Sequence, residues 1–212
     1  MAGLVEARAA DTTAFTNWLA AQTNLHSWSA EVTQTRTLKT LAQPLVSTGR
    51  VWFAAPNQFR WELGRPAQTI AVRQTNAMLV IYPRLKRVER YPLAGTQHSQ
   101  WRDMLALLEA GFPRSQAELE ARFKITAPAT ASDPQQIILQ PRSAAARRLM
   151  PQIQLTFSTN DLTLHATELQ FADGSTLRNE FQRPALNPKL PDDTFAPKIG
   201  DDFKVVEPLK RP

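Results

Sequence analysis

The chain has 212 residues, which is the size of one large domain or two small ones. Its composition, 42% hydrophobic and 21% charged, is typical of a folded globular protein and excludes wholesale disorder and fibrous repeats. Cysteine is absent, which excludes disulfide scaffolds, thiolate metal sites and cysteine nucleophiles. The longest apolar run, residues 77–82, is far shorter than the roughly 20 residues of a membrane-spanning helix. The opening MAGLVEAR has no apolar stretch of signal-peptide length, so an exported protein is expected here with its leader removed.

The chain carries 25 basic and 19 acidic residues, a net charge of +6. A basic chain can attract nucleic acid, but these residues form no long stripe and gather in short clusters within 84–90, 142–148 and 210–211. A solvated, mildly basic surface is the favoured interpretation, with long-range attraction to acidic partners second. We therefore expect no nucleic-acid partner.

The N-terminal region predicts a helix followed by a strand. Asp11 and Thr12 can cap a helix, and the apolar residues that follow have three- and four-residue spacing: Phe15, Trp18, Leu19 and Leu25. From Trp28 the apolar period changes to two, which predicts a half-buried strand.

The rest of the first half predicts an antiparallel meander. Residues 49–55 end before Pro56, and residues 59–63 alternate between apolar and charged side chains, so the two segments predict a hairpin. Further strands are predicted at 69–73, 77–82 and 86–91.

The middle of the chain predicts two helices. Ser99 can cap a helix that ends near Gly111 and has one apolar face, made of Trp101, Met104, Leu105 and Leu108. Ser115 and Glu118 form a capping box for a second, short helix that ends near Phe123.

Strand patterns resume in the second half, at 136–140, 153–157, 162–169 and 177–181, with Asp173 and Gly174 as turn residues between the last two. The proline-rich segment 184–212 is expected to be extended and partly ordered. Without repeats or a low-complexity linker, the pattern predicts a single α+β domain over residues 1–212, with flexible ends at 1–11 and 207–212.

No catalytic constellation is apparent in the sequence. His26, His98 and His165 each lack a second ligand at metal-binding spacing, so we expect no metal site. The chain has no nucleophile elbow, phosphate-cradling glycine loop or dinucleotide fingerprint. We therefore expect no cofactor and no enzymatic activity.

Several predicted strands are apolar on both faces. Val51, Phe53 and Ala55 share one parity, Trp52 and Ala54 share the other, and residues 77–82 are apolar throughout. One explanation is a curved sheet closed over its own core. The other is an open barrel whose concave face binds an apolar ligand, with the 101–108 helix as a lid.

Four segments resemble the periplasmic outer-membrane lipoprotein carrier family, LolA and its relatives. SWSAEVTQTR (27–36) is similar to the family's first strand, GRVWFAAPNQFRWELGRP (49–66) to its second and third, and VIYPRLKRVERY (80–91) to its strand-proline-strand turn. LQFADGSTLRNEFQRPALNPKLPDDTF (169–195) is similar to the family's DG hairpin and closing segment.

The resemblance implies an α+β fold with an unclosed antiparallel half-barrel of about 10–11 strands. It also implies a helical lid and a cavity for the acyl chains of lipoproteins or of another envelope lipid. The chain would act as a monomeric periplasmic carrier or chaperone between an inner-membrane donor and an outer-membrane acceptor. The expected lipid-cavity residues are Val51, Phe53, Ala55, Phe59, Trp61, Ile70, Val72, Met78 and Val80, and the expected lid residues are Trp101, Met104, Leu105 and Leu108.

One position departs from the family pattern. The archetypal carriers have an arginine before the proline of the second strand, where it holds the lid, whereas this chain has Ala55 before Pro56. Arg60 and Arg65 flank the Phe59–Trp61 pair and offer either a replacement charge or solvated strand-edge residues. The resemblance thus leaves open a second role, a non-transporting interaction or lipid-sensing module of the cell envelope.

Overall fold

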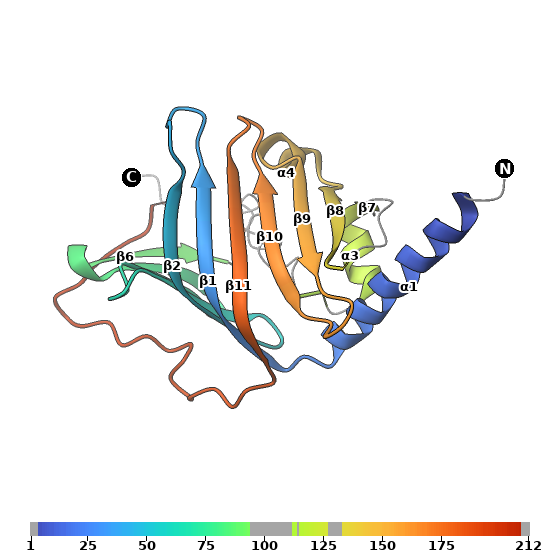
Figure 1. Ribbon diagram of the computed structural model, residues 1–212. Coiled ribbons are helices and arrows are strands. Elements are labelled where there is room, and N and C mark those ends of the chain that lie inside the picture. Colours follow the sequence, from blue (N-terminus) through green and yellow to red (C-terminus); the bar gives the residue numbers. More distant parts are fainter. Residues whose placement is uncertain (1–3, 94–111, 114, 127–132, 209–212) are drawn as a thin grey trace. The chain divides into compact units, whose positions relative to one another are not determined.

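The computed structural model describes residues 4–93, 112–113, 115–126 and 133–208, and their side chains from residue 13 onward (Figure 1). The helices are α1 (Leu4–Thr23), α3 (Gln116–Arg122), α4 (Ala144–Leu149) and the 3-10 turn η1 (Pro83–Leu85). The strands are β1 (Ser27–Thr37), β2 (Leu45–Ala54), β3 (Gln58–Leu63), β4 (Thr69–Arg73), β5 (Ala77–Tyr82), β6 (Arg87–Pro92), β7 (Phe123–Thr126), β8 (Gln135–Pro141), β9 (Gln152–Phe157), β10 (Leu164–Gln170), β11 (Thr176–Leu186) and β12 (Lys204–Val206). Within these residues, no helix is long and apolar enough to cross a membrane.

The strands form a 12-stranded sheet in the order β12-β6-β5-β4-β3-β2-β1-β11-β10-β9-β8-β7. The pairings along β2 to β6 and along β7 to β11 are antiparallel, and β12 joins β6 in parallel. In the described part of the chain β7 and β12 end the sheet and do not pair with each other, so the sheet is not closed into a barrel. This confirms the expected fold class, an unclosed antiparallel sheet with few helices.

Two short strands, β7 and β12, are not predicted by the sequence pattern. β7 begins at Phe123, directly after α3, where the sequence predicts only the end of a helix. β12 is a three-residue strand inside the proline-rich tail. Both are short, so neither carries enough alternating residues to give a period-two signal.

The predicted helix caps are confirmed at one helix and wrong at another. The side chain of Ser115 accepts a hydrogen bond from the Glu118 N–H, as a capping box requires. In contrast, α1 begins at Leu4, so Asp11 and Thr12 lie inside the helix. The preceding LVEARAA consists mostly of strong helix formers, which extend the helix beyond the predicted cap.

Glycine is required at two positions of the sheet, one where two strands approach closely and one in a turn. Gly49 faces the backbone of Glu62 across the β2–β3 ladder, where any Cβ would overlap the Glu62 carbonyl. Gly174 has a φ of +79° in the turn between β10 and β11. In the same turn the Ser175 N–H and hydroxyl both donate to the Asp173 carboxylate, which confirms the predicted Asp-Gly turn.

The chain divides into two compact units, and the first contains residues 1–24, 34–46 and 106–181. Its core lies on one face of β8 and β9, where the side chains are fully buried: Ile137, Leu139, Ile153 and Leu155. α1 packs there, since the ring of Trp18 stacks on Phe157 with 4.9 Å between ring centroids, and Phe15 lies 6.5 Å from Phe157. The apolar face predicted for α1 is thus buried.

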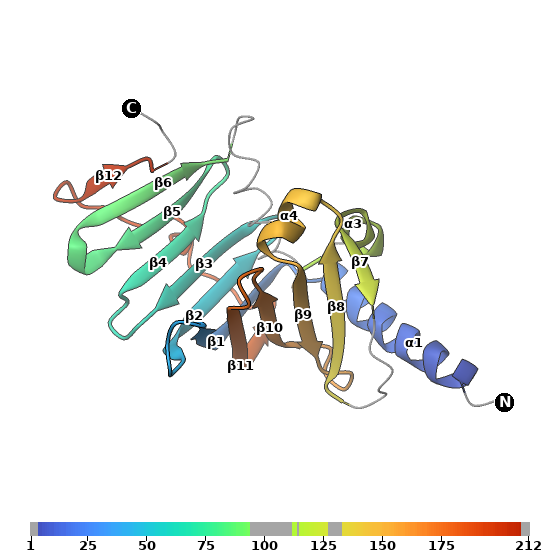
Figure 2. The ribbon, with the colours of Figure 1, turned by 90° about the horizontal axis from the view of Figure 1, so that it is seen from above.

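The second unit contains residues 25–33, 47–105 and 182–212. Figure 2 shows its strands β3, β4, β5, β6 and β12 side by side, in the order that their pairing gives. This unit contains the strands whose sequence is apolar on both faces, and therefore the expected lipid-cavity residues.

Candidate functional site: an apolar face on strands β2 to β6

The register of the second unit assigns each strand residue to one of two faces. Val51 pairs with Trp61, and Phe53 pairs with Phe59, so these four side chains share a face. The ladders that follow place Ala71, Arg73, Met78 and Val80 on the same side. We call it the Phe59 face, and it contains Val51, Phe53, Phe59, Trp61, Ala71, Arg73, Met78, Val80, Glu89 and Tyr91.

The Phe59 face combines buried and accessible apolar groups. Val51 and Met78 are nearly inaccessible, and Phe53 and Phe59 retain only 8% and 9% of their exposure. Trp61 and Val80 are half-buried. The face therefore presents aromatic and aliphatic surface that is partly open, which is the chemistry that an apolar ligand needs.

A polar row on β6 borders this apolar surface. The Arg87 guanidinium forms an ion pair of 2.7 Å with the Glu89 carboxylate, and the Tyr91 hydroxyl donates to that carboxylate at 2.8 Å. Burial, and then the hydrogen bond to Glu89, raise the pKa of Tyr91 above its ordinary value. The phenol therefore stays protonated, and the row keeps its donors and acceptor paired.

The opposite side, which we call the Leu79 face, is a packed core. Ala77, Leu79, Ile81 and Val88 form a buried cluster, and Ile70 and Phe203 pack against it.

The C-terminal segment is tied to these strands by several polar contacts. The Lys204 N–H donates to the Lys86 carbonyl at 2.7 Å, and the Lys86 ammonium pairs with Asp202 at 2.9 Å and lies 5.1 Å from the Phe203 ring centroid. Arg60 donates to the Thr194 carbonyl at 3.0 Å. Phe203 of this segment packs against the Leu79 face, which explains why Ala77, Leu79 and Ile81 on that side are apolar.

Two expected cavity residues lie on the face opposite Phe59. Ile70 pairs with Glu62 and Ile81, and Val72 pairs with Arg60 and Leu79, so both belong to the Leu79 face. Parity within one strand relates Ile70 to Val72, but only the turn between β3 and β4 decides which of them shares a face with Phe59. That turn pairs Leu63 with Thr69 and so puts Ala71 beside Trp61.

Ala55 also differs from the expectation. It lies beyond the end of β2, its side chain is exposed, and its N–H donates to the His26 carbonyl at 2.8 Å. Because the strand ends at Ala54, the alternation that orients Val51 and Phe53 no longer applies at position 55. Ala55 is therefore not part of the Phe59 face.

The arginines near the site also differ from expectation. Arg60 lies on the Leu79 face and pairs with Glu62 at 2.6 Å, whereas Arg65 lies in the β3–β4 turn, 3.6 Å from the Glu31 carboxylate. Arg73 is not among the residues expected from sequence, but the register places it on the Phe59 face opposite both Phe59 and Met78. Alternation along β4 places Arg73 on the same side as Ala71. Without the pairing to β3, it does not show which face of the sheet that side is.

The lid residues expected from sequence, Trp101, Met104, Leu105 and Leu108, lie outside the described residues, as does His98. Within the described ranges, no group of three His, Asp or Glu side chains could hold a metal ion. The structure thus brings together six of the nine expected cavity residues on one face: Val51, Phe53, Phe59, Trp61, Met78 and Val80.

Comparison with known proteins relates the chain to one family. A family model described as outer membrane lipoprotein carrier protein LolA matches residues 23–198. A comparison with curated protein sequences finds no match.

Solved structures resemble the chain at low sequence identity. An uncharacterized conserved protein from Thermus thermophilus has a TM-score of 0.55 and 9% identity, with 92% of this chain and 99% of that chain covered. The Pseudomonas aeruginosa MucA/MucB complex gives a TM-score of 0.48 and 14% identity, over 93% of this chain and 63% of that chain. A LolA superfamily protein from Nitrosomonas europaea gives a TM-score of 0.43 and 10% identity, over 85% and 96%.

Proposed function

Because the chain belongs to the outer membrane lipoprotein carrier (LolA) family, we propose that it carries lipoprotein acyl chains, or another envelope lipid, on the Phe59 face. Members of this family are carriers or binding proteins rather than enzymes. In this proposal the whole chain acts as one monomeric periplasmic domain, which receives its cargo from an inner-membrane donor and delivers it to an outer-membrane acceptor. The helix predicted over residues 99–111 serves as its lid.

The observation that carries the proposal is the cross-strand pairing of large apolar side chains at the centre of the face. Val51 opposes Trp61 and Phe53 opposes Phe59, so two adjacent strands place aromatic and aliphatic side chains next to one another on one face, with Val51, Phe53 and Phe59 buried. Trp61 and Val80 keep accessible area beside their buried neighbours. Such a surface can bind an alkyl chain without a hydrogen-bonding partner, because the gain comes from apolar area removed from water.

The energetics of release favour an adaptable surface over a tight cavity. Each buried methylene contributes about 0.8 kcal/mol, so an acyl chain of roughly 16 carbons would contribute on the order of 12 kcal/mol before ordering costs. A carrier must lose most of this gain to release its cargo. The flexible side chain of Met78 suits a loosely packed lining, because methionine adapts its shape at little cost.

The test compares two half-buried residues on opposite faces of the same sheet, Trp61 and Ile70. Trp61→Glu places a carboxylate on the Phe59 face and is expected to abolish binding of a fluorescent C16 fatty acid, because a desolvated charge opposes ligand entry. Ile70→Glu disturbs the Leu79 face and is expected to lower stability while the folded fraction still binds the probe. Phe59→Glu should weaken binding as Trp61→Glu does.

Urea unfolding of each variant gives the folded fraction by which its binding is normalised. Equal loss of normalised binding in Trp61→Glu and Ile70→Glu would overturn the assignment of the site to the Phe59 face. Unimpaired binding by Trp61→Glu would overturn it as well.

The alanine at position 55 supports a second candidate function, that of an interaction or lipid-sensing module of the envelope. The resemblance implies a lid-holding arginine at this position, and an exposed alanine cannot make its charge-assisted hydrogen bonds. A carrier moves the fluorescent fatty acid from donor to acceptor vesicles, whereas a sensing module binds the probe without accelerating its transfer. Vesicle-to-vesicle transfer rates therefore separate the two functions.

A further inference from the structure

One rim of the first compact unit brings together three segments that are distant in sequence: residues 36–46, 142–149 and 171–175. The Ala172 N–H donates to the Leu149 carbonyl at 3.0 Å, and the Lys39 side chain lies directly over Gly174. Figure 1 shows the β1–β2 hairpin, the β10–β11 turn and α4 at the same end of this unit. We call this surface the Leu149 rim.

The Leu149 rim exposes large apolar side chains. Val46 keeps 61% of its exposure, and Leu41, Leu45 and Leu149 keep 45%, 52% and 51%. Exposed hydrophobic residues usually occur singly on soluble domains, so a group of them on adjoining segments marks an interaction surface.

The same three segments are strongly basic. They contain five basic residues, Arg36, Lys39, Arg142, Arg147 and Arg148, and one acidic residue, Asp173. Two of the guanidinium groups are held by backbone carbonyls, which orient them without neutralising their charge: Arg147 donates to Pro141 at 2.9 Å and to Arg142 at 2.7 Å, and Arg142 donates to Glu120 at 2.6 Å. Among the described residues, neither arginine forms an ion pair with a carboxylate.

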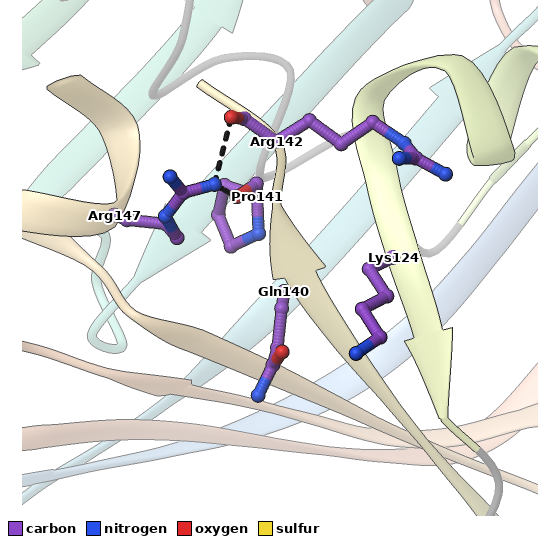
Figure 3. A pocket seen from close by; sticks show the side chains of 5 residues that line it. All are labelled: Lys124, Gln140, Pro141, Arg142 and Arg147. Atoms are coloured by element: carbon purple, nitrogen blue, oxygen red, sulfur yellow. Dashed lines mark hydrogen bonds between the residues drawn. The ribbon is translucent and has the colours of Figure 1, made fainter. Parts of the chain in front are cut away.

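A basic hollow adjoins the rim where β8 leads into α4. Its volume is about 290 Å³, and it is lined by Lys124, Gln140, Pro141, Arg142 and Arg147. Figure 3 shows the Lys124 side chain beside Gln140, and the Arg147 guanidinium bonded to the Arg142 carbonyl. The register confirms that Lys124 and Gln140 are cross-strand partners on β7 and β8. The lining contains three cationic residues and no acidic residue, so it suits a phosphate group.

We propose that the Leu149 rim docks on the surface of an anionic phospholipid bilayer. The tip of the β1–β2 hairpin enters the interface between headgroups and acyl chains end-on, so that Leu45 and Val46, on opposite sides of β2, insert together with Leu41 and Leu149. The basic residues face the lipid phosphates, and the hollow receives one headgroup phosphate. Interfacial membrane binding combines these two features, apolar insertion and attraction of basic residues to anionic lipid. An acidic protein partner would account for the charge alone and would leave the exposed apolar residues unexplained.

Docking would place a lipid carrier at the surface where its cargo enters or leaves, so the inference deepens the proposed function. Its residues are different, however, because the rim belongs to the first unit and the Phe59 face to the second. Membrane docking and acyl binding can therefore fail separately.

The test is flotation of the full chain with vesicles of phosphatidylcholine, either pure or with phosphatidylglycerol as the anionic lipid. We expect the protein to float with the anionic vesicles, to remain unbound with the neutral ones, and to dissociate at high salt. Replacing Arg148 or Lys124 by alanine should weaken the partition about fivefold each, because one basic residue near an anionic membrane contributes about that factor. The double variant Leu41→Ser/Val46→Ser should weaken it by about tenfold or more.

The second unit offers matched controls on the β5–β6 turn. Leu85 is 70% exposed and its neighbour Arg84 is also exposed, so Leu85→Ser and Arg84→Ala remove the same kinds of group from another surface. These controls should partition like the wild type. Equal loss in the control and rim variants would overturn the proposal, and so would a wild-type protein that does not float with anionic vesicles.

The variants also separate this inference from the proposed function. Leu41→Ser/Val46→Ser should bind the fluorescent fatty acid in solution as the wild type does, whereas Trp61→Glu should still float with anionic vesicles. If the wild type floats but takes up no fatty acid, the carrier function fails and the docking surface stands.

Discussion

Two apolar sheet faces, one in each compact unit, show how the same alternating pattern leads to different surfaces. On β8 and β9 of the first unit, Leu139 and Leu155 are fully buried, and α1 lays Trp18 against Phe157. On the Phe59 face of the second unit, Trp61 is only half-buried, and Arg73 interrupts the apolar row. The first face is a core sealed by a helix, whereas the second combines apolar surface with charge, as a binding surface does.

The largest loss of stability is expected in the core of the first unit, where α1 packs against β9. Phe157→Ala removes the ring that Trp18 and Phe15 pack against and leaves a cavity in a fully buried site. The free energy of unfolding should fall by about 3–5 kcal/mol, the usual cost of this truncation in a core. Urea unfolding followed by tryptophan fluorescence measures it. A loss as small as that of an exposed residue would show that this face is not a sealed core.

A smaller loss is expected on the Leu79 face of the second unit. Phe203→Ala uncovers part of the cluster formed by Ala77, Leu79, Ile81 and Val88 and removes the ring beneath the Lys86 ammonium. Because Phe203 is half-buried, about 2 kcal/mol should be lost, roughly half the cost at a buried site.

Fatty-acid binding by the folded Phe203→Ala protein should not change. Loss of binding without loss of stability would mean that the Leu79 face, rather than the Phe59 face, binds the ligand.

A pH-dependent effect is expected at the turn that precedes β10 in the first unit. Burial alone would raise the pKa of Asp161, but hydrogen bonds from the Thr163 hydroxyl, at 2.7 Å, and N–H, at 3.0 Å, outweigh it and hold the pKa below 3.8. A lowered folded-state pKa stabilises the protein above the unfolded value of 3.8, and this stabilisation disappears as the pH falls through the folded value.

The wild type should therefore be more stable than Asp161→Asn at neutral pH, and the difference should shrink as the pH falls below 3.8. Urea midpoints of both proteins across this range provide the measurement, with exposed Asp192→Asn as the control. A difference that does not change with pH would contradict the expected linkage.

The smallest effect on stability and on fatty-acid release is expected for a substitution at Ala55. The residue is exposed and lies beyond the end of β2, so Ala55→Arg should change the free energy of unfolding by no more than about 0.5 kcal/mol. Fatty-acid release from the folded protein should proceed at the wild-type rate, measured by stopped-flow fluorescence. A slower release would show that the residue at position 55 takes part in holding the ligand.

Local sequence signals predicted most of the elements, because caps and alternation are properties of short segments. The Ser115–Glu118 capping box, the alternating residues of β3 and the Asp173–Gly174 turn all carried enough information in a few residues. The predicted start of α1 was wrong because good helix formers precede the predicted cap and extend the helix to Leu4. β7 and β12 were missed because three or four residues cannot establish a period.

The candidate site was predicted only in part, because the sequence does not contain the registers between strands. Alternation showed that Phe59 and Trp61 share a face, and also that Ile70 and Val72 do. It could not relate the two pairs, since the geometry of the connecting turn decides their relative parity. The same uncertainty concealed Arg73, which lies on the Phe59 face although its strand was predicted correctly.

The sequence by itself determined the fold class, the family resemblance and the strands that contain the candidate site, because these depend on composition, period and the order of motifs. Only the tertiary structure decided which face of each strand is core. Phe203 comes from far along the chain to cover the Leu79 face, and segments near residues 39, 149 and 172 meet at one rim of the first unit. Contacts between residues so distant in sequence depend on the path of the whole chain, which no local pattern records.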